Sequence, residues 1–127
     1  MIWTIDPACA VQAGNVRRAC VSHLASEASG DSDVPAAASI IAEILANAVE
    51  HGEAPIEMVL RWENGAAIAE VHDRGVGFES KRRVLPEPTS SRGRGLYLVQ
   101  ELSEGLHVYR KKDDGTVVCA RLPVRRR

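Results

Sequence analysis

A glutamate and an asparagine four residues apart, Glu43 and Asn47, are the residues whose spacing first indicates chemistry. They belong to an apolar helical pattern in which Ile41, Ile44 and Leu45 fall on one stripe. At about 100° per residue, Glu43 and Asn47 lie one turn apart on the opposite side. A carboxylate and a side-chain amide oxygen at this spacing suit a hydrated divalent cation, although a solvated helix face shows the same pattern.

Two glycine-bearing segments follow in order, VHDRGVGF at 71–78 and SSRGRGLYLVQEL at 90–102. In the first, Asp73 ends an expected strand, and its acceptor-only carboxylate suits an exocyclic amine. In the second, Gly93 and Gly95 open an apolar helix, whose unsatisfied amides form an anion site. The P-loop pattern with its lysine does not occur in the sequence. The two segments together therefore favour a different kind of nucleotide site.

A Glu-Asn helix, an Asp-x-Gly-x-Gly turn and a helix-opening Gly-x-Gly resemble the N, G1 and G2 boxes of the Bergerat-fold (GHKL) ATPases. The resemblance implies binding of ATP with Mg²⁺. It implies that Asn47 holds the metal, that Glu43 is the general base near the γ-phosphate, and that Asp73 takes the adenine amino group. The other ATP-binding residues that it implies are Gly75, Gly77, Gly93, Arg94, Gly95 and Leu96.

Within this superfamily the chain is most similar to the bacterial anti-sigma factor serine/threonine kinases, over nearly its whole length. The N-A-x-x-H-G motif at 47–52, a short strand and helix before it, and a brief ATP lid at 79–92 carry the likeness. In that family the γ-phosphate passes to a serine or threonine of a STAS-fold antagonist, and the kinase dimer otherwise sequesters a sigma factor. The resemblance thus implies a STAS-domain partner, a sigma factor and a homodimer. Arg17 matches an arginine that contacts the antagonist.

Two other functions remain open at this point. One is a module that binds ATP or ADP and gates a protein contact without transferring phosphate. The other is a detached histidine-kinase ATPase domain, although no phosphoacceptor helix pair fits within the chain. Glu50 also departs from the basic residue that many histidine kinases carry at that step. The sequence leaves open the roles of His51, Arg18 and the basic residues of the lid.

Length and composition narrow the function classes. The chain has 127 residues, which predicts one domain spanning 1–127. Its 16 Lys and Arg against 17 Asp and Glu give a net charge of -1, so no basic field favours direct nucleic-acid binding. No apolar run approaches about 18 residues, which argues against a membrane span and favours a cytoplasmic protein. The three cysteines lack metal-ligand spacing, and residues 125–127 are expected to form a frayed tail.

The pattern predicts an α+β fold, a two-layer α/β sandwich with a mixed, mostly antiparallel sheet and about three helices on one face. Asp6-Pro7 is expected to start the first helix, Asp33 to cap the second, and Gly52 to end the second in a left-handed conformation. The third helix follows Gly93. The expected strands lie at 2–5, 56–63, 66–73, 106–111 and 116–122, with an Asn-Gly hairpin turn between the second and third.

Overall fold

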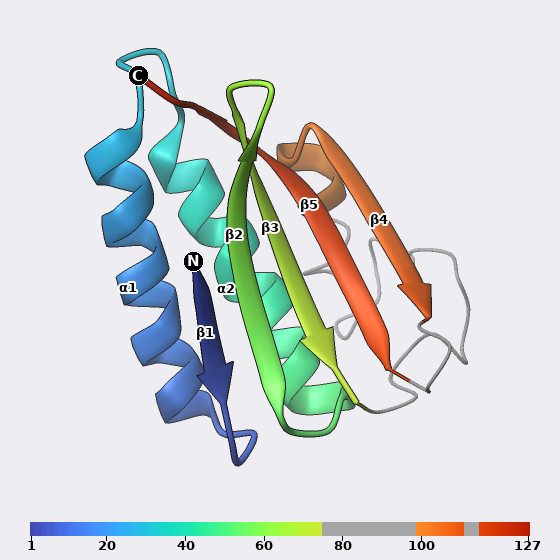
Figure 1. Ribbon diagram of the computed structural model, residues 1–127. Helices are drawn as coiled ribbons and strands as arrows, with labels where there is room; N and C mark the ends of the chain where they lie inside the picture. Colours follow the sequence, from blue (N-terminus) through green and yellow to red (C-terminus); the bar gives the residue numbers. More distant parts are fainter. Residues whose placement is uncertain (75–98, 111–114) are drawn as a thin grey trace.

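The computed structural model describes residues 1–74, 99–110 and 115–127. Within these ranges, helices α1 (Ala10–Glu27) and α2 (Val34–His51) pack on one face of a five-stranded sheet (Figure 1). Its pairings are all antiparallel, in the order β1-β2-β3-β5-β4. This two-layer arrangement confirms the predicted fold class. The strands are β1 (Ile2–Ile5), β2 (Ile56–Glu63), β3 (Ala66–Asp73), β4 (Gly105–Arg110) and β5 (Thr116–Arg125).

The β2–β3 hairpin follows the predicted bounds. Asn64 and Gly65 both have positive φ, 52° and 83°, as the two central residues of a type I′ turn require. The turn fixes the register, so that Met58 pairs with Val71 on the core side of the sheet. This register determines which residue closes β3, and therefore where the predicted base-binding carboxylate lies.

Helix α2 begins as predicted. The side chain of Asp33 accepts a hydrogen bond from the backbone N–H of Ala36 at 3.1 Å, and Pro35 occupies the first turn. The helix buries one apolar stripe against the sheet. At about 1.5–3 kcal/mol for each large side chain, this burial makes α2 a rigid support for the polar residues on its other side. The buried residues are Ala37, Ile40, Ile41, Ile44, Leu45 and Ala48.

Helix α1 begins three residues later than Asp6-Pro7 predicts. Its N-cap is Cys9, whose Sγ accepts from the N–H of Gln12 at 3.4 Å, and Asp6 and Pro7 form the connection from β1. The side chain of Gln12 accepts from the N–H of Asp6 at 3.2 Å. This hydrogen bond ties the Asp6-Pro7 segment, which lies outside the helix, to the first turn of α1.

The expected frayed tail at 125–127 was also wrong. Strand β5 continues to Arg125, and Arg126 forms an ion pair with Glu27 at 3.0 Å. The guanidinium of Arg126 also lies 5.5 Å from the ring centroid of Trp62. Backbone hydrogen bonds from Ser29 and Asp33 to β5 tie the α1–α2 loop to the end of the sheet. Three arginines in succession give no sequence signal for these contacts with distant partners.

The expected third helix is described only at 99–102, which is helical. The apolar pattern of this helix predicts that Val99 and Leu102 face the core. Val99 is buried, whereas Leu102 is 41% exposed, so the prediction for Leu102 was wrong. The helix ends directly after Leu102. Strand β4 runs one residue earlier than predicted, and the turn at 111–114 lies outside the described residues.

Candidate functional site

Helix α2 presents Glu43 and Asn47 on the side away from its buried stripe. Both side chains are partly exposed, as the helical pattern predicts. The Nδ2 of Asn47 donates to the backbone carbonyl oxygen of Glu43 at 2.9 Å. This bond orients the amide and leaves Oδ1 as the atom that can bind a cation. Mg²⁺ prefers such oxygen ligands, so this pair of side chains fits the predicted metal-binding role.

Asp73 closes β3 and is buried, with only 5% of its surface exposed. It pairs with Thr116, the first residue of β5, which is fully buried. These are the two buried polar or charged residues within the described part of the chain. A carboxylate held at a strand end, with little access to water, is a fixed hydrogen-bond acceptor, as a site that reads an amine requires.

Nothing in the sequence singles out Thr116, the buried residue that pairs with Asp73. Threonine is common in strands, so its type alone carries no functional signal. The usable signal was its register. Thr116 opens β5 and lies opposite Asp73, the predicted base-binding carboxylate, which closes β3.

The end of α2 lies directly against Asp73. A Cβ placed on Gly52 would lie 2.5 Å from the Cγ of Asp73 and 2.7 Å from its Oδ2. The two motifs are further tied by a hydrogen bond from the N–H of Arg74 to the carbonyl oxygen of Glu53 at 3.0 Å. The structure therefore brings the helix that carries Glu43 into contact with the strand end that carries Asp73.

The predicted left-handed conformation of Gly52 was wrong. Its φ is −99° and its ψ is −171°, which is extended backbone, and its N–H donates to the carbonyl oxygen of Ala48 at 2.8 Å. A glycine after the last helical residue often indicates a left-handed cap. Here the close approach of Asp73 is what leaves no room for a side chain.

The side chains of His51 and Glu50 contact each other in the last turn of α2. The Nε2 of His51 lies 2.8 Å from Oε1 of Glu50, and their side chains are 19% and 57% exposed. This carboxylate thus contacts the neighbouring histidine. The helix end next to Asp73 is consequently polar on its outer side.

The glycine-rich part of the predicted site lies outside the described residues. Gly75 and Gly77, the lid at 79–92, and the phosphate-binding residues Gly93, Arg94, Gly95 and Leu96 all belong to the undescribed range 75–98. Their assignments stay predictions. The described residues on either side are Arg74, directly after β3, and Val99, in the core.

Arg17 lies in a groove between the two helices, which we call the α1–α2 groove. It has a volume of about 160 Å³ and is lined by Ala10, Ala13, Gly14, Arg17, Ala42, Leu45 and Ala46. Arg17 provides the charged side chain of this otherwise apolar lining. Its neighbour Arg18 is exposed and donates to the Oδ1 of Asn15, so the two consecutive arginines occupy different environments.

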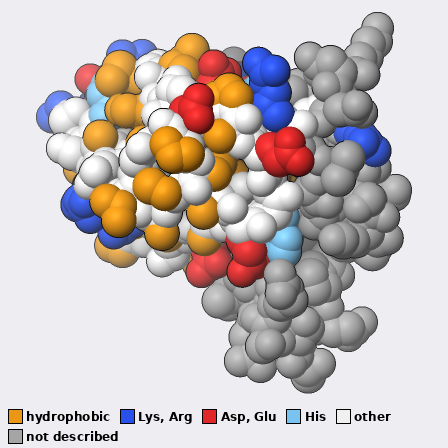
Figure 2. Space-filling model, turned by 90° about the horizontal axis from the view of Figure 1, so that it is seen from below, with side chains coloured by type: hydrophobic (Ala, Val, Ile, Leu, Met, Phe, Trp, Pro, Cys, Tyr) orange, Lys and Arg blue, Asp and Glu red, His pale blue; other side chains and the backbone are white. Residues whose placement is uncertain are grey.

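The end of the molecule where α2 and β3 terminate is shown in Figure 2. Hydrophobic side chains gather over the described surface there, and acidic and histidine side chains lie along its border with the undescribed part. The helix end and the strand end meet on this side of the fold, at the bottom of Figure 1.

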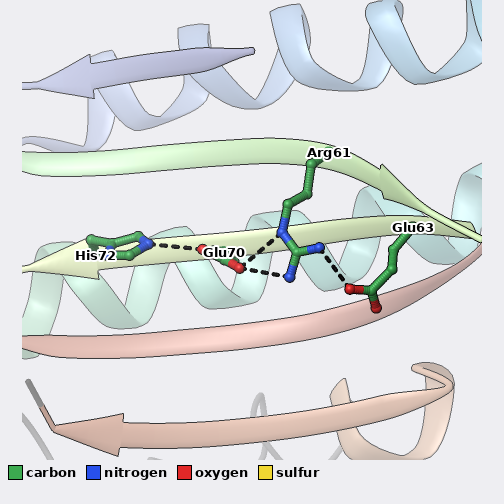
Figure 3. A network of polar contacts seen from close by, with 4 residues as sticks. All are labelled: Arg61, Glu63, Glu70 and His72. Atoms are coloured by element: carbon green, nitrogen blue, oxygen red, sulfur yellow. Dashed lines mark hydrogen bonds and ion pairs between the residues drawn. The ribbon is translucent and has the colours of Figure 1, made fainter.

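A second polar cluster lies on the face of the sheet opposite to α1 and α2 (Figure 3). Glu70 accepts from the Nε and Nη2 of Arg61 at 3.1 and 3.0 Å, and its other oxygen lies 3.0 Å from Nε2 of His72. Partial burial raises the pKa of Glu70, but the hydrogen bonds from His72 and Arg61 outweigh it and lower the pKa below its usual value. None of the predicted site residues belongs to this cluster, which holds β2 and β3 together.

Within residues 1–74, 99–110 and 115–127, no group of three His, Cys, Asp or Glu side chains could hold a metal ion. Mg²⁺ in phosphate-transfer sites usually takes one or two protein oxygens, with nucleotide and water oxygens completing its shell. No helix in the described ranges is long and apolar enough to cross a membrane.

A helix bearing Glu and Asn, packed on an antiparallel sheet and touching a strand-end aspartate, is the arrangement expected of a GHKL ATPase. The chain belongs to the histidine kinase-like ATPase domain family, whose model matches residues 6–122. It is therefore a kinase-like ATPase domain. No curated protein matches the chain significantly.

Three solved structures show the same fold. The RsbU and RsbW domains of Rv1364c from Mycobacterium tuberculosis match with a TM-score of 0.68 and 23% identity, over 100% of this chain and 33% of that one. The blue-light activated histidine kinase of Erythrobacter litoralis matches with a TM-score of 0.56 and 22% identity, over 88% of this chain and 59% of that one. The Acinetobacter baumannii histidine kinase AdeS matches with a TM-score of 0.52 and 12% identity, over 72% of this chain and 47% of that one. The chain thus spans from about a third to three fifths of these proteins.

Proposed function

We propose that the chain is an ATP-dependent protein serine/threonine kinase of the anti-sigma factor type, acting in the cytoplasm as one domain over residues 1–127. The observation that carries the proposal is the contact between the end of α2 and Asp73. It brings the ends of two motifs that are separated in sequence next to each other, which supports a common site for one adenine nucleotide. The likeness to a structure that contains an RsbW domain supports the choice among kinase-like ATPases.

In this proposal Asp73 accepts a hydrogen bond from the adenine amino group, and its burial keeps water from competing. Asn47 would hold Mg²⁺ through Oδ1, and a bound ion would neutralise charge on the phosphates. The backbone amides at 93–96 bind the phosphate chain, and Gly75 and Gly77 let the backbone approach the base.

Glu43 acts as the general base. Its carboxylate accepts the proton of a serine or threonine hydroxyl, whose oxygen forms a bond to the γ-phosphorus as the bond to the β–γ bridging oxygen breaks. ADP leaves with the electron pair of that bond. Glu43 is partly exposed on α2, so an incoming hydroxyl can reach it.

The partner we propose is a STAS-domain protein of the anti-anti-sigma type, with a sigma factor as a second partner and a homodimer as the binding form. Arg17 is the proposed contact residue. Ala42 and Ala46, which line the α1–α2 groove with Arg17, lie about 60–100° around α2 from Glu43. A partner seated on Arg17 would therefore lie next to the helix face that carries the general base.

The test is phosphotransfer from Mg-ATP to the STAS-type protein encoded nearest to this chain, followed by mass analysis. We expect one acid-stable phosphate on a serine or threonine, and its loss in Glu43→Gln with ATP binding retained. Arg17→Glu should raise the KM for the partner, whereas the exposed control Arg18→Glu should not. An acid-labile product would indicate a histidine kinase, and ATP binding without transfer would indicate a nucleotide-gated binding module.

A further inference from the structure

Gly52 occupies the point where the end of α2 touches the end of β3. Its backbone is extended, a conformation that any residue adopts, so the local geometry does not require glycine. Space does require it. A Cβ at this position would lie 2.5 Å from the Cγ of Asp73, 2.7 Å from its Oδ2 and 2.8 Å from the carbonyl oxygen of Ala48. These separations are all shorter than van der Waals contact.

The neighbouring backbone leaves little freedom to relieve such a clash. The N–H of Gly52 is bonded to Ala48 at 2.8 Å, and the carbonyl oxygen of the next residue, Glu53, accepts from the N–H of Arg74 at 3.0 Å. The residue after Gly52 is thus hydrogen-bonded to the residue after Asp73. A side chain at position 52 must therefore displace the carboxylate of Asp73, separate the helix end from the strand end, or disturb the hydrogen bond to Ala48.

We propose that Gly52 is a positioning residue for the carboxylate of Asp73, and through it a determinant of selectivity for the 6-amino group of adenine. The inference rests on the proposed function, in which Asp73 reads that group. The absence of a side chain at position 52 sets the place of the acceptor. Selectivity for the base then depends on a residue that acts through Asp73.

The test compares ATP with purine riboside triphosphate, which is ATP without its 6-amino group, in calorimetric titrations of the full chain. The wild type should prefer ATP by roughly tenfold or more, as expected for one hydrogen bond to a buried carboxylate. In Gly52→Ala this preference should fall to within about threefold, with affinity for purine riboside triphosphate retained. The matched control is Gly30→Ala, since a Cβ on the exposed Gly30 meets nothing within 4 Å.

The outcomes separate this inference from the proposed function. A wild type with no preference for ATP would refute the assignment of Asp73 as the base-reading residue. A wild-type preference that survives in Gly52→Ala would refute only the role of Gly52. Equal loss of affinity for both nucleotides, with the preference intact, would show that Gly52 acts on the fold as a whole and would overturn the positioning role.

A stability measurement tests the contact without any nucleotide. Gly52→Ala should lower the midpoint of urea unfolding more in the wild-type background than in Asp73→Ala, where the clashing Cγ and Oδ2 are gone. If Gly52→Ala alone fails to fold, a folded double variant supports the contact with Asp73. An equal cost in both backgrounds, or a double variant that stays unfolded, places the clash at Ala48 and overturns the proposal.

Discussion

Replacing Asn47 by alanine should separate metal-assisted ATP binding from stability. The change removes one hydrogen bond from Nδ2 to the carbonyl oxygen of Glu43, which is worth about 0.5–1 kcal/mol at a half-buried position. Alanine recovers up to about 0.7 kcal/mol because it is the better helix former. The carbonyl oxygen lies in the helix interior and keeps its backbone partner. The net change in unfolding free energy should therefore stay within about 0.5 kcal/mol.

The effect on binding should be much larger. Loss of the Oδ1 ligand should weaken ATP binding about tenfold or more in the presence of Mg²⁺, and little in its absence. The assay is calorimetric titration with ATP, once with Mg²⁺ and once with EDTA, together with a thermal scan in which Tm should move by no more than about 3 °C. The matched control is Asn15→Ala, which removes a helical asparagine that contacts Arg18 on α1. An undiminished gain in affinity from Mg²⁺ in Asn47→Ala would refute the reasoning.

Two further predictions concern pH and thiol chemistry. Glu70 has a lowered pKa, so its ionised form stabilises the fold above its ordinary value of 4.5, and this contribution is lost as pH falls through the lowered value. Glu70→Gln should thus lower the free energy of unfolding by about 1 kcal/mol at neutral pH. In urea titrations the unfolding free energies of wild type and variant should converge as the pH falls below 4.5. Burial raises the pKa of Cys20 to about 12, so in the folded protein a thiol reagent should modify the more exposed Cys9 long before Cys20, as peptide mass mapping would show. Comparable modification rates at the two cysteines would contradict the burial of Cys20.

The predictable parts of this fold are those decided by local pattern. The Asn64-Gly65 turn has strict backbone requirements, so the hairpin that ends in Asp73 follows from the sequence alone. The apolar stripe of α2 and its Asp33 cap are equally local, and they place Glu43 and Asn47 on the opposite face.

The features that sequence could not predict depend on long-range contacts. Gly52 indicated a helix cap, yet its role comes from a side chain 21 positions further along the chain. The fixed position of residues 125–127 depends on Glu27 in α1 and Trp62 in β2, which both contact Arg126. The position of Thr116 opposite Asp73 follows only from the β3–β5 register. Local periodicity carries no information about such partners.

The most direct test of the whole account is a crystal structure of the chain with Mg²⁺ and a non-hydrolysable ATP analogue. The account predicts one nucleotide, with the adenine amino group on the carboxylate of Asp73, the metal on Oδ1 of Asn47, and the carboxylate of Glu43 beside the γ-phosphate. A nucleotide bound elsewhere, or one that leaves these three side chains in separate cavities, would contradict it.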